Sequence, residues 1–166
     1  MRTTIEDWEF EVDVSATAEY SAKEALDHCD CAYCRNFYAA VDNHYPGLRP
    51  LLERFGANVE APDALMPYDR FGAMTYEAFY SVRGRVVTAG QMPIRVGNAV
   101  VCPGRFPDLQ IDMHCDEPYL FLNVSNLMLP WVLLEPMDQV ISPANQPSFL
   151  RKIWNRLLKK KNIPDS

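Results

Sequence analysis

Apolar and acidic residues alternate strictly near the start of the chain. The apolar members are Trp8, Phe10, Val12 and Val14, and the acidic members are Asp7, Glu9, Glu11 and Asp13. A period of two is typical of a strand that turns one face to a core and the other to water. We therefore predict a strand over residues 7–14, and its acidic face also discourages edge-to-edge pairing.

A helical period replaces this alternation between residues 21 and 56. Ser21 and Glu24 have the spacing of a capping box, which predicts the start of a short helix. Asp30 is a candidate N-cap for a second helix. Four residues of that second helix share one side: Cys34, Phe37, Tyr38 and Val41. A Pro-Gly pair then separates it from a third helix expected over residues 48–55.

The character of the sequence changes to strands between residues 74 and 135. Runs rich in Tyr, Phe and Val predict strands over residues 74–87, 94–101, 106–115 and 119–127, with a short last strand at 131–134. Prolines fall between these runs, where a missing backbone donor does least harm. A spacing of about ten residues per unit favours consecutive antiparallel strands over strand–helix–strand crossovers.

A basic amphipathic helix is predicted over residues 148–161. Its apolar stripe consists of Phe149, Leu150, Ile153, Trp154, Leu157 and Leu158. Together these elements predict a single α+β domain spanning residues 1–166. We expect an antiparallel sheet, open, curled or folded into a sandwich, covered by the helices of residues 21–56 and by the C-terminal helix.

Charge is distributed unevenly along the 166 residues. The net charge is −6, yet residues 148–161 carry six basic groups and no acidic one. The rest of the chain is therefore strongly acidic and would repel nucleic acid, so we expect no nucleic-acid partner. The basic C-terminal helix is either packed on the sheet or available to a protein partner.

Several features predict a cytoplasmic protein without a membrane span. No apolar run approaches the roughly 18 residues that a spanning helix needs, and residues 1–14 lack the pattern of a signal peptide. Five cysteines are an odd number, which is typical of thiols kept reduced or bound to metal in a reducing compartment.

The densest chemistry in the chain is the run His28-Cys29-Asp30-Cys31-Ala32-Tyr33-Cys34. Three thiolates this close in sequence could converge on one tetrahedral zinc ion, with zinc–sulfur distances of about 2.3 Å. The candidate metal ligands are Cys29, Cys31, Cys34 and His28, with His114, Cys115 and Cys102 as further candidates. The usual zinc signature pairs two such cysteine motifs, whereas this chain has one compact cluster. An iron–sulfur cluster uses similar ligands and is a weaker interpretation still.

Two other interpretations of the same cysteines stay open. Cys31 and Cys34 form a C-x-x-C pair at the expected start of a helix, where the helix dipole stabilises a thiolate and favours redox chemistry. The negative charge of Asp30 works against that thiolate. Alternatively, Cys34 is a small apolar residue of an ordinary core stripe.

A weaker constellation lies on the strand expected at residues 106–115 and just beyond it. Asp112, His114 and Asp116 would share one face of that strand, where two carboxylates could flank an imidazole. Such a row is more often the wet face of a sheet. The chain carries none of the standard glycine-rich, zinc-protease or serine-hydrolase motifs.

Two stretches resemble a family of small bacterial proteins to which no activity is assigned. They are Cys29-Asp30-Cys31-Ala32-Tyr33-Cys34-Arg35-Asn36-Phe37 and Leu129-Pro130-Trp131-Val132-Leu133. The resemblance implies a single-domain, cytoplasmic bacterial protein and transfers no catalytic residue. We therefore expect a non-enzymatic structural or interaction module, with a zinc-stabilised module and a thiol-dependent redox protein as alternatives.

Overall fold

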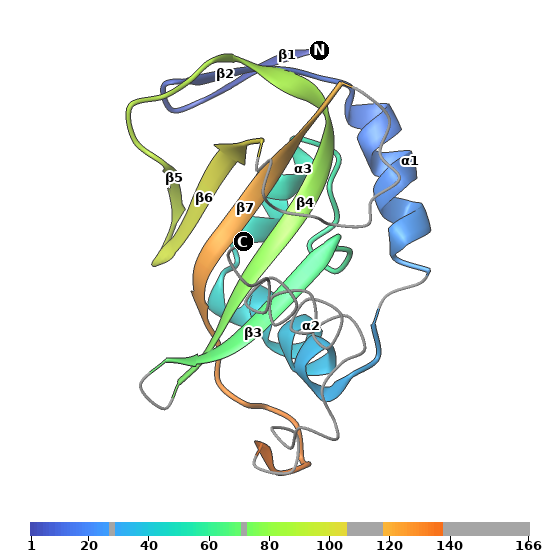
Figure 1. Cartoon of the computed structure of the whole chain (residues 1–166), viewed down its shortest axis with the longest axis vertical. Coiled ribbons are helices and arrows are strands. Elements are labelled where there is room, and N and C mark those ends of the chain that lie inside the picture. Colours follow the sequence, from blue (N-terminus) through green and yellow to red (C-terminus); the bar gives the residue numbers. More distant parts are fainter. Residues whose placement is uncertain (27–28, 71–72, 106–117, 138–166) are drawn as a thin grey trace, which may run out of the picture.

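The computed structural model describes residues 1–26, 29–70, 73–105 and 118–137, and it places an antiparallel sheet against a small group of helices (Figure 1). The elements follow one another as β1 (Arg2–Ile5), β2 (Trp8–Val12), α1 (Val14–Glu24), α2 (Ala32–His44), α3 (Leu48–Glu53), β3 (Ala64–Arg70), β4 (Ala73–Thr88), β5 (Ile94–Val96), β6 (Ala99–Gly104) and β7 (Tyr119–Met128). An α+β architecture with an antiparallel sheet is what the sequence predicts.

Strand β4 organises the sheet. Its 16 residues pair with β3 through the first half and with β2 through the second half, while β7 runs along its other side. The strand order is β1-β2-β4-β7-β6-β5, with β3 paired to β4 off this path, and every pairing is antiparallel.

The core lies between one face of this sheet and helices α2 and α3, which are behind the sheet in the view of Figure 1. Strand β4 alternates, so Tyr76 and Tyr80 point into this core, where both are fully buried. The ring of Phe37 on α2 lies 5.5 Å from that of Tyr76. Phe55, which follows α3, meets Phe10 of β2 edge-on at 5.0 Å. Aromatic residues therefore join both helices to the sheet.

The first helix differs from its prediction. It begins at Val14 and not at Ser21, because the Asp13 carboxylate accepts a hydrogen bond from the Ala16 N–H at 3.0 Å and caps a helix there. Val14, expected as a strand residue, is thus helical. Ser21 is inside the helix, and its hydroxyl accepts from the Asn58 N–H at 2.9 Å. The helix lies beside β4, where the Thr17 hydroxyl accepts from the Arg83 N–H.

Further differences concern the strands. The strand expected at residues 94–101 is a hairpin of β5 and β6, because Gly97 has a φ of 58° and turns the chain. Residues 131–134 form no strand and lie against α2 instead. The sequence did not predict β1 or β3. The predicted strand at 106–115 and the predicted helix at 148–161 lie outside the described residues. Among the helices that are described, none has the length and apolarity that crossing a membrane requires.

Candidate metal centre

The three clustered cysteines lie where the chain enters α2. Cys31 is the N-cap residue of this helix, and Cys34 lies in its first turn. Cys29 lies two residues before Cys31. Asp30, expected as the cap, is one residue too early. Its exposed carboxylate instead lies 3.8 Å from the Arg35 guanidinium. The helix therefore begins with a sulfur at its positive end, where negative charge is stabilised.

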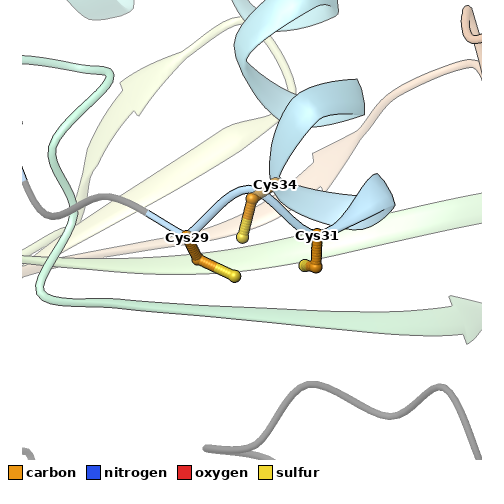
Figure 2. Close-up of side chains that lie close together, drawn as sticks. All are labelled: Cys29, Cys31 and Cys34. Carbon is orange, nitrogen blue, oxygen red and sulfur yellow. The ribbon is translucent and has the colours of Figure 1, made fainter.

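The side chains of these cysteines converge (Figure 2). The three sulfur atoms all lie within 4.8 Å of one another, and none is in a disulfide. Sulfurs bound tetrahedrally to one zinc ion at about 2.3 Å lie about 3.8 Å apart, so a small inward movement would bring all three to bonding distance. A cubane iron–sulfur cluster needs wider spacing, because each cysteine binds a different iron atom. The geometry favours a single ion.

Burial decreases across the cluster toward the surface. Cys34 is buried, Cys31 is half-buried and Cys29 is exposed. The site is therefore anchored in the core on one side and open to solution on the other. Such placement gives an ion a route to the sulfurs without unfolding of the helix.

Hydrogen bonding divides the protons unequally among the sulfurs. A hydrogen bond from the Cys34 thiol, assisted by the N–H groups of Cys34 and Tyr33, lowers the pKa of Cys31 to about 5. The same hydrogen bond, together with burial, raises the pKa of Cys34. Burial also raises the pKa of Cys29.

Tyrosine side chains surround the buried side of the cluster. Burial, with a smaller contribution from the neighbouring cysteines, raises the pKa of Tyr38. Burial raises the pKa of Tyr76, whose hydroxyl donates to the Tyr33 carbonyl at 3.2 Å and accepts from Asn36 at 3.0 Å. These hydroxyls stay protonated around neutral pH, so the negative charge of the site resides on sulfur.

The remaining predicted ligands have different outcomes. Cys102 lies on β6, paired with Asn123 of β7, and is not a member of the cluster. His28, His114 and Cys115 lie outside the described residues, as do Asp112 and Asp116. Within the described residues, the three cysteines form the one group of histidine, cysteine and carboxylate side chains that could hold an ion.

Sequence reasoning missed the residues that support the cluster from outside. Arg35 donates from Nη1 to the Asp30 carbonyl at 2.6 Å and from Nη2 to the Glu135 carboxylate. Asn36 is fully buried and accepts from the Val132 N–H at 2.7 Å. No local signal in the sequence could have found these contacts, because the partners lie about one hundred residues apart.

Comparison of the chain with protein-family models, with curated proteins and with solved structures gave no significant match. The resemblance to the bacterial family therefore stays an expectation, and the function has to be argued from the site.

Proposed function

We propose that this chain is a non-enzymatic metal-binding module in which Cys29, Cys31 and Cys34 hold one zinc ion. The observation that carries the proposal is the convergence of three reduced sulfurs within 4.8 Å at the start of α2. Thiolate ligands are soft and select zinc, copper(I) and iron among the metals of a reducing compartment.

The electrostatics of the cluster suit a cation. Because the pKa of Cys31 is about 5, this sulfur is ionised at neutral pH before any ion arrives. The ion then displaces the protons of Cys29 and Cys34, as metal binding to thiols generally does. The partial positive charge at the start of α2 offsets part of the charge of three thiolates.

The ion would join two parts of the chain. Cys34 belongs to the buried core stripe of α2, whereas Cys29 lies in the exposed stretch before the helix. A bond from each to the same ion fixes this stretch onto the helix, which is how structural zinc contributes to folding.

Cobalt substitution tests the proposal. The protein is purified under reducing conditions, stripped with a chelator and titrated with Co²⁺, whose absorption reports thiolate ligation and coordination number. We expect sulfur-to-cobalt charge-transfer absorption and tetrahedral ligand-field bands that saturate at one equivalent and disappear when Zn²⁺ is added. Cys102→Ser serves as the matched control and leaves the spectrum unchanged. A spectrum without thiolate bands contradicts the proposal.

A second candidate function, thiol–disulfide exchange, is favoured by one observation. The low pKa of Cys31 beside the raised pKa of Cys34 is the asymmetry that an attacking and a resolving cysteine need. The Cys31 thiolate would attack a substrate disulfide and expel one thiolate. Cys34, after losing its proton, would attack the mixed disulfide, release the second substrate thiolate and leave a Cys31–Cys34 disulfide.

The two functions give opposite results in one assay. The metal-free protein is mixed with a small aromatic disulfide, and the coloured thiolate released is followed with and without one equivalent of zinc. With a dithiol reductant supplied, a redox protein releases the thiolate well above the rate that the reductant gives alone, and Cys34→Ser loses this acceleration. A zinc module reacts at most once per thiol and is protected by the ion.

A further inference from the structure

The Arg35 side chain connects the cysteine cluster to a part of the chain one hundred residues away. Its Nη1 donates to the carbonyl of Asp30, which lies between Cys29 and Cys31, at 2.6 Å. Its Nη2 donates to the carboxylate of Glu135. One guanidinium therefore holds the backbone between two candidate metal ligands and the end of the segment that follows β7.

Asn36 forms a second connection to the same segment. Its Nδ2 donates to the Pro130 carbonyl at 3.1 Å, and its Oδ1 accepts from the Val132 N–H at 2.7 Å. Because Asn36 is fully buried, these hydrogen bonds are protected from competition by water. The segment over residues 130–135 is thus held by its backbone as well as by its charged end.

An aromatic contact completes the attachment. The rings of Tyr33 and Trp131 meet edge-on with centroids 6.0 Å apart, and the indole N–H of Trp131 donates to the Glu135 carbonyl at 2.7 Å. Residues 31–36 therefore contribute to two features of the molecule. Cys31 and Cys34 belong to the candidate metal site. Tyr33, Arg35 and Asn36 contact segment 130–135.

The same segment carries apolar side chains on the surface. Leu134 is fully exposed and the exposed fraction of Val132 is 46%. A change in how firmly residues 130–135 are held would therefore change how these two side chains are presented to solution.

We propose that metal occupancy of the Cys29–Cys31–Cys34 site regulates the position of segment 130–135, an inference that rests on the proposed zinc-binding function. An ion bound to Cys29 and Cys31 fixes the Asp30 carbonyl between them. That carbonyl then fixes Arg35, and Arg35 retains Glu135. By thermodynamic linkage the effect is reciprocal, so the attached segment also strengthens zinc binding by the same factor.

Trp131 is the reporter for the test. In full-length protein carrying Trp8→Phe and Trp154→Phe, Trp131 is the remaining tryptophan. The metal-free protein is titrated with zinc chloride while Trp131 emission is recorded, and zinc affinity is measured by competition with a chromophoric chelator. We expect saturation at one equivalent and a shift of emission to shorter wavelength, because an anchored segment shields the indole.

Breaking the charged contact tests whether the coupling passes through Arg35 and Glu135. In Glu135→Gln we expect zinc affinity to fall about 1.4- to 5-fold, the range for an exposed ion pair, together with a smaller shift in Trp131 emission. The matched control is Arg85→Gln, which removes an exposed arginine–glutamate pair with Glu11 between β4 and β2. This variant should bind zinc like the parent and show the full emission shift.

The possible failures are distinguishable. If the parent protein binds one zinc while Trp131 emission stays constant and Glu135→Gln binds zinc equally well, the coupling is wrong and the zinc-binding function stands. If the parent protein binds no zinc under reducing conditions, both the zinc-binding function and the coupling are overturned.

Discussion

The sulfur atoms of Cys31 and Cys34 lie within 4.8 Å of each other at the start of α2, and their interaction drives the two pKa values apart. The pKa of Cys31 falls to about 5 because it accepts from the Cys34 thiol, and the pKa of Cys34 rises for the same reason. The cluster is thus already partly ionised in the absence of an ion. The consequences can be measured on the thiols, on the ion and on the neighbouring hydrogen bonds.

The reactivity of the thiols should follow their different pKa values. In metal-free protein near pH 7, we expect iodoacetamide to alkylate Cys31 before Cys29, Cys34 or Cys102, because Cys31 is ionised and half-buried whereas burial raises the pKa of Cys102. Peptide mapping by mass spectrometry after short exposure identifies the order. One equivalent of zinc should protect Cys31. Equal reaction of Cys31 and the other three thiols named here, or reaction of Cys102 first, would contradict the assigned pKa values.

The stability lost on replacing Cys34 should depend on whether zinc is present. In the presence of a chelator, Cys34→Ala loses packing and its contact with Cys31, and we expect the free energy of unfolding to fall by about 1–3 kcal/mol. With free zinc at about one hundred times its dissociation constant, the parent protein gains about 2.7 kcal/mol from binding, and the variant should gain far less. Urea denaturation with and without zinc measures the difference.

Cys102→Ala provides the comparison for this experiment. Cys102 is half-buried on β6 and outside the cluster. Its replacement should therefore lower the free energy of unfolding by the same amount with and without zinc. If Cys34→Ala loses the same free energy of unfolding with and without zinc, Cys34 contributes to packing and not to metal binding.

The buried Asn36 should contribute strongly to stability. Asn36→Ala removes the donor to Pro130 and the acceptor for the Val132 N–H, and leaves the Tyr76 hydroxyl without its donor. An unsatisfied buried polar group costs about 1–3 kcal/mol, so we expect a loss of that size by urea denaturation. Asn43→Ala is the matched control on the same helix, where Asn43 is exposed, and it should change stability by less than about 0.5 kcal/mol. Similar losses in the two variants would refute the role of Asn36.

The Asp13 cap predicts an acid-dependent loss of stability. Hydrogen bonds from the Ala16 N–H and the Ser15 hydroxyl lower the pKa of Asp13 in the folded protein. Its contribution is therefore complete above the pKa of the unfolded chain and is lost as the pH falls through the folded value. Asp13→Asn keeps an oxygen acceptor and does not titrate.

The measurement for this prediction is the difference in urea midpoint between parent and Asp13→Asn at neutral and at acid pH. The urea midpoint of the parent should exceed that of Asp13→Asn at neutral pH, and this difference should shrink as the pH is lowered. A difference that is constant between the two pH values would show that ionisation of Asp13 contributes nothing to α1.

Local patterns in the sequence predicted those elements whose own residues determine them. Alternation over residues 8–12 reports a half-buried strand directly, and β2 lies there. The start of α1 was wrong because Asp13 ends the alternation as an acidic strand residue and also begins a helix as its cap. Strand β3 was missed because Pro67 interrupts its pattern. The proline is tolerated since β3, among the strands that the structure describes, pairs with β4 alone.

The candidate site likewise has a part that local sequence predicts and a part that depends on distant contacts. Three cysteines within six residues can meet by local geometry alone, and the structure brings their sulfurs together. The contacts of Arg35 with Glu135 and of Asn36 with Val132 span about one hundred residues, so no local pattern predicts them. They follow from the position of β7 beside β4, which delivers the chain after Met128 to the start of α2.

Native mass spectrometry of the reconstituted protein tests the central claim most directly. Protein reduced, stripped and then supplied with a small excess of zinc is compared with a variant carrying Cys29→Ser, Cys31→Ser and Cys34→Ser. The account predicts one zinc ion per parent chain and none on the variant. A parent chain that carries no zinc, or a variant that keeps the ion, would contradict it.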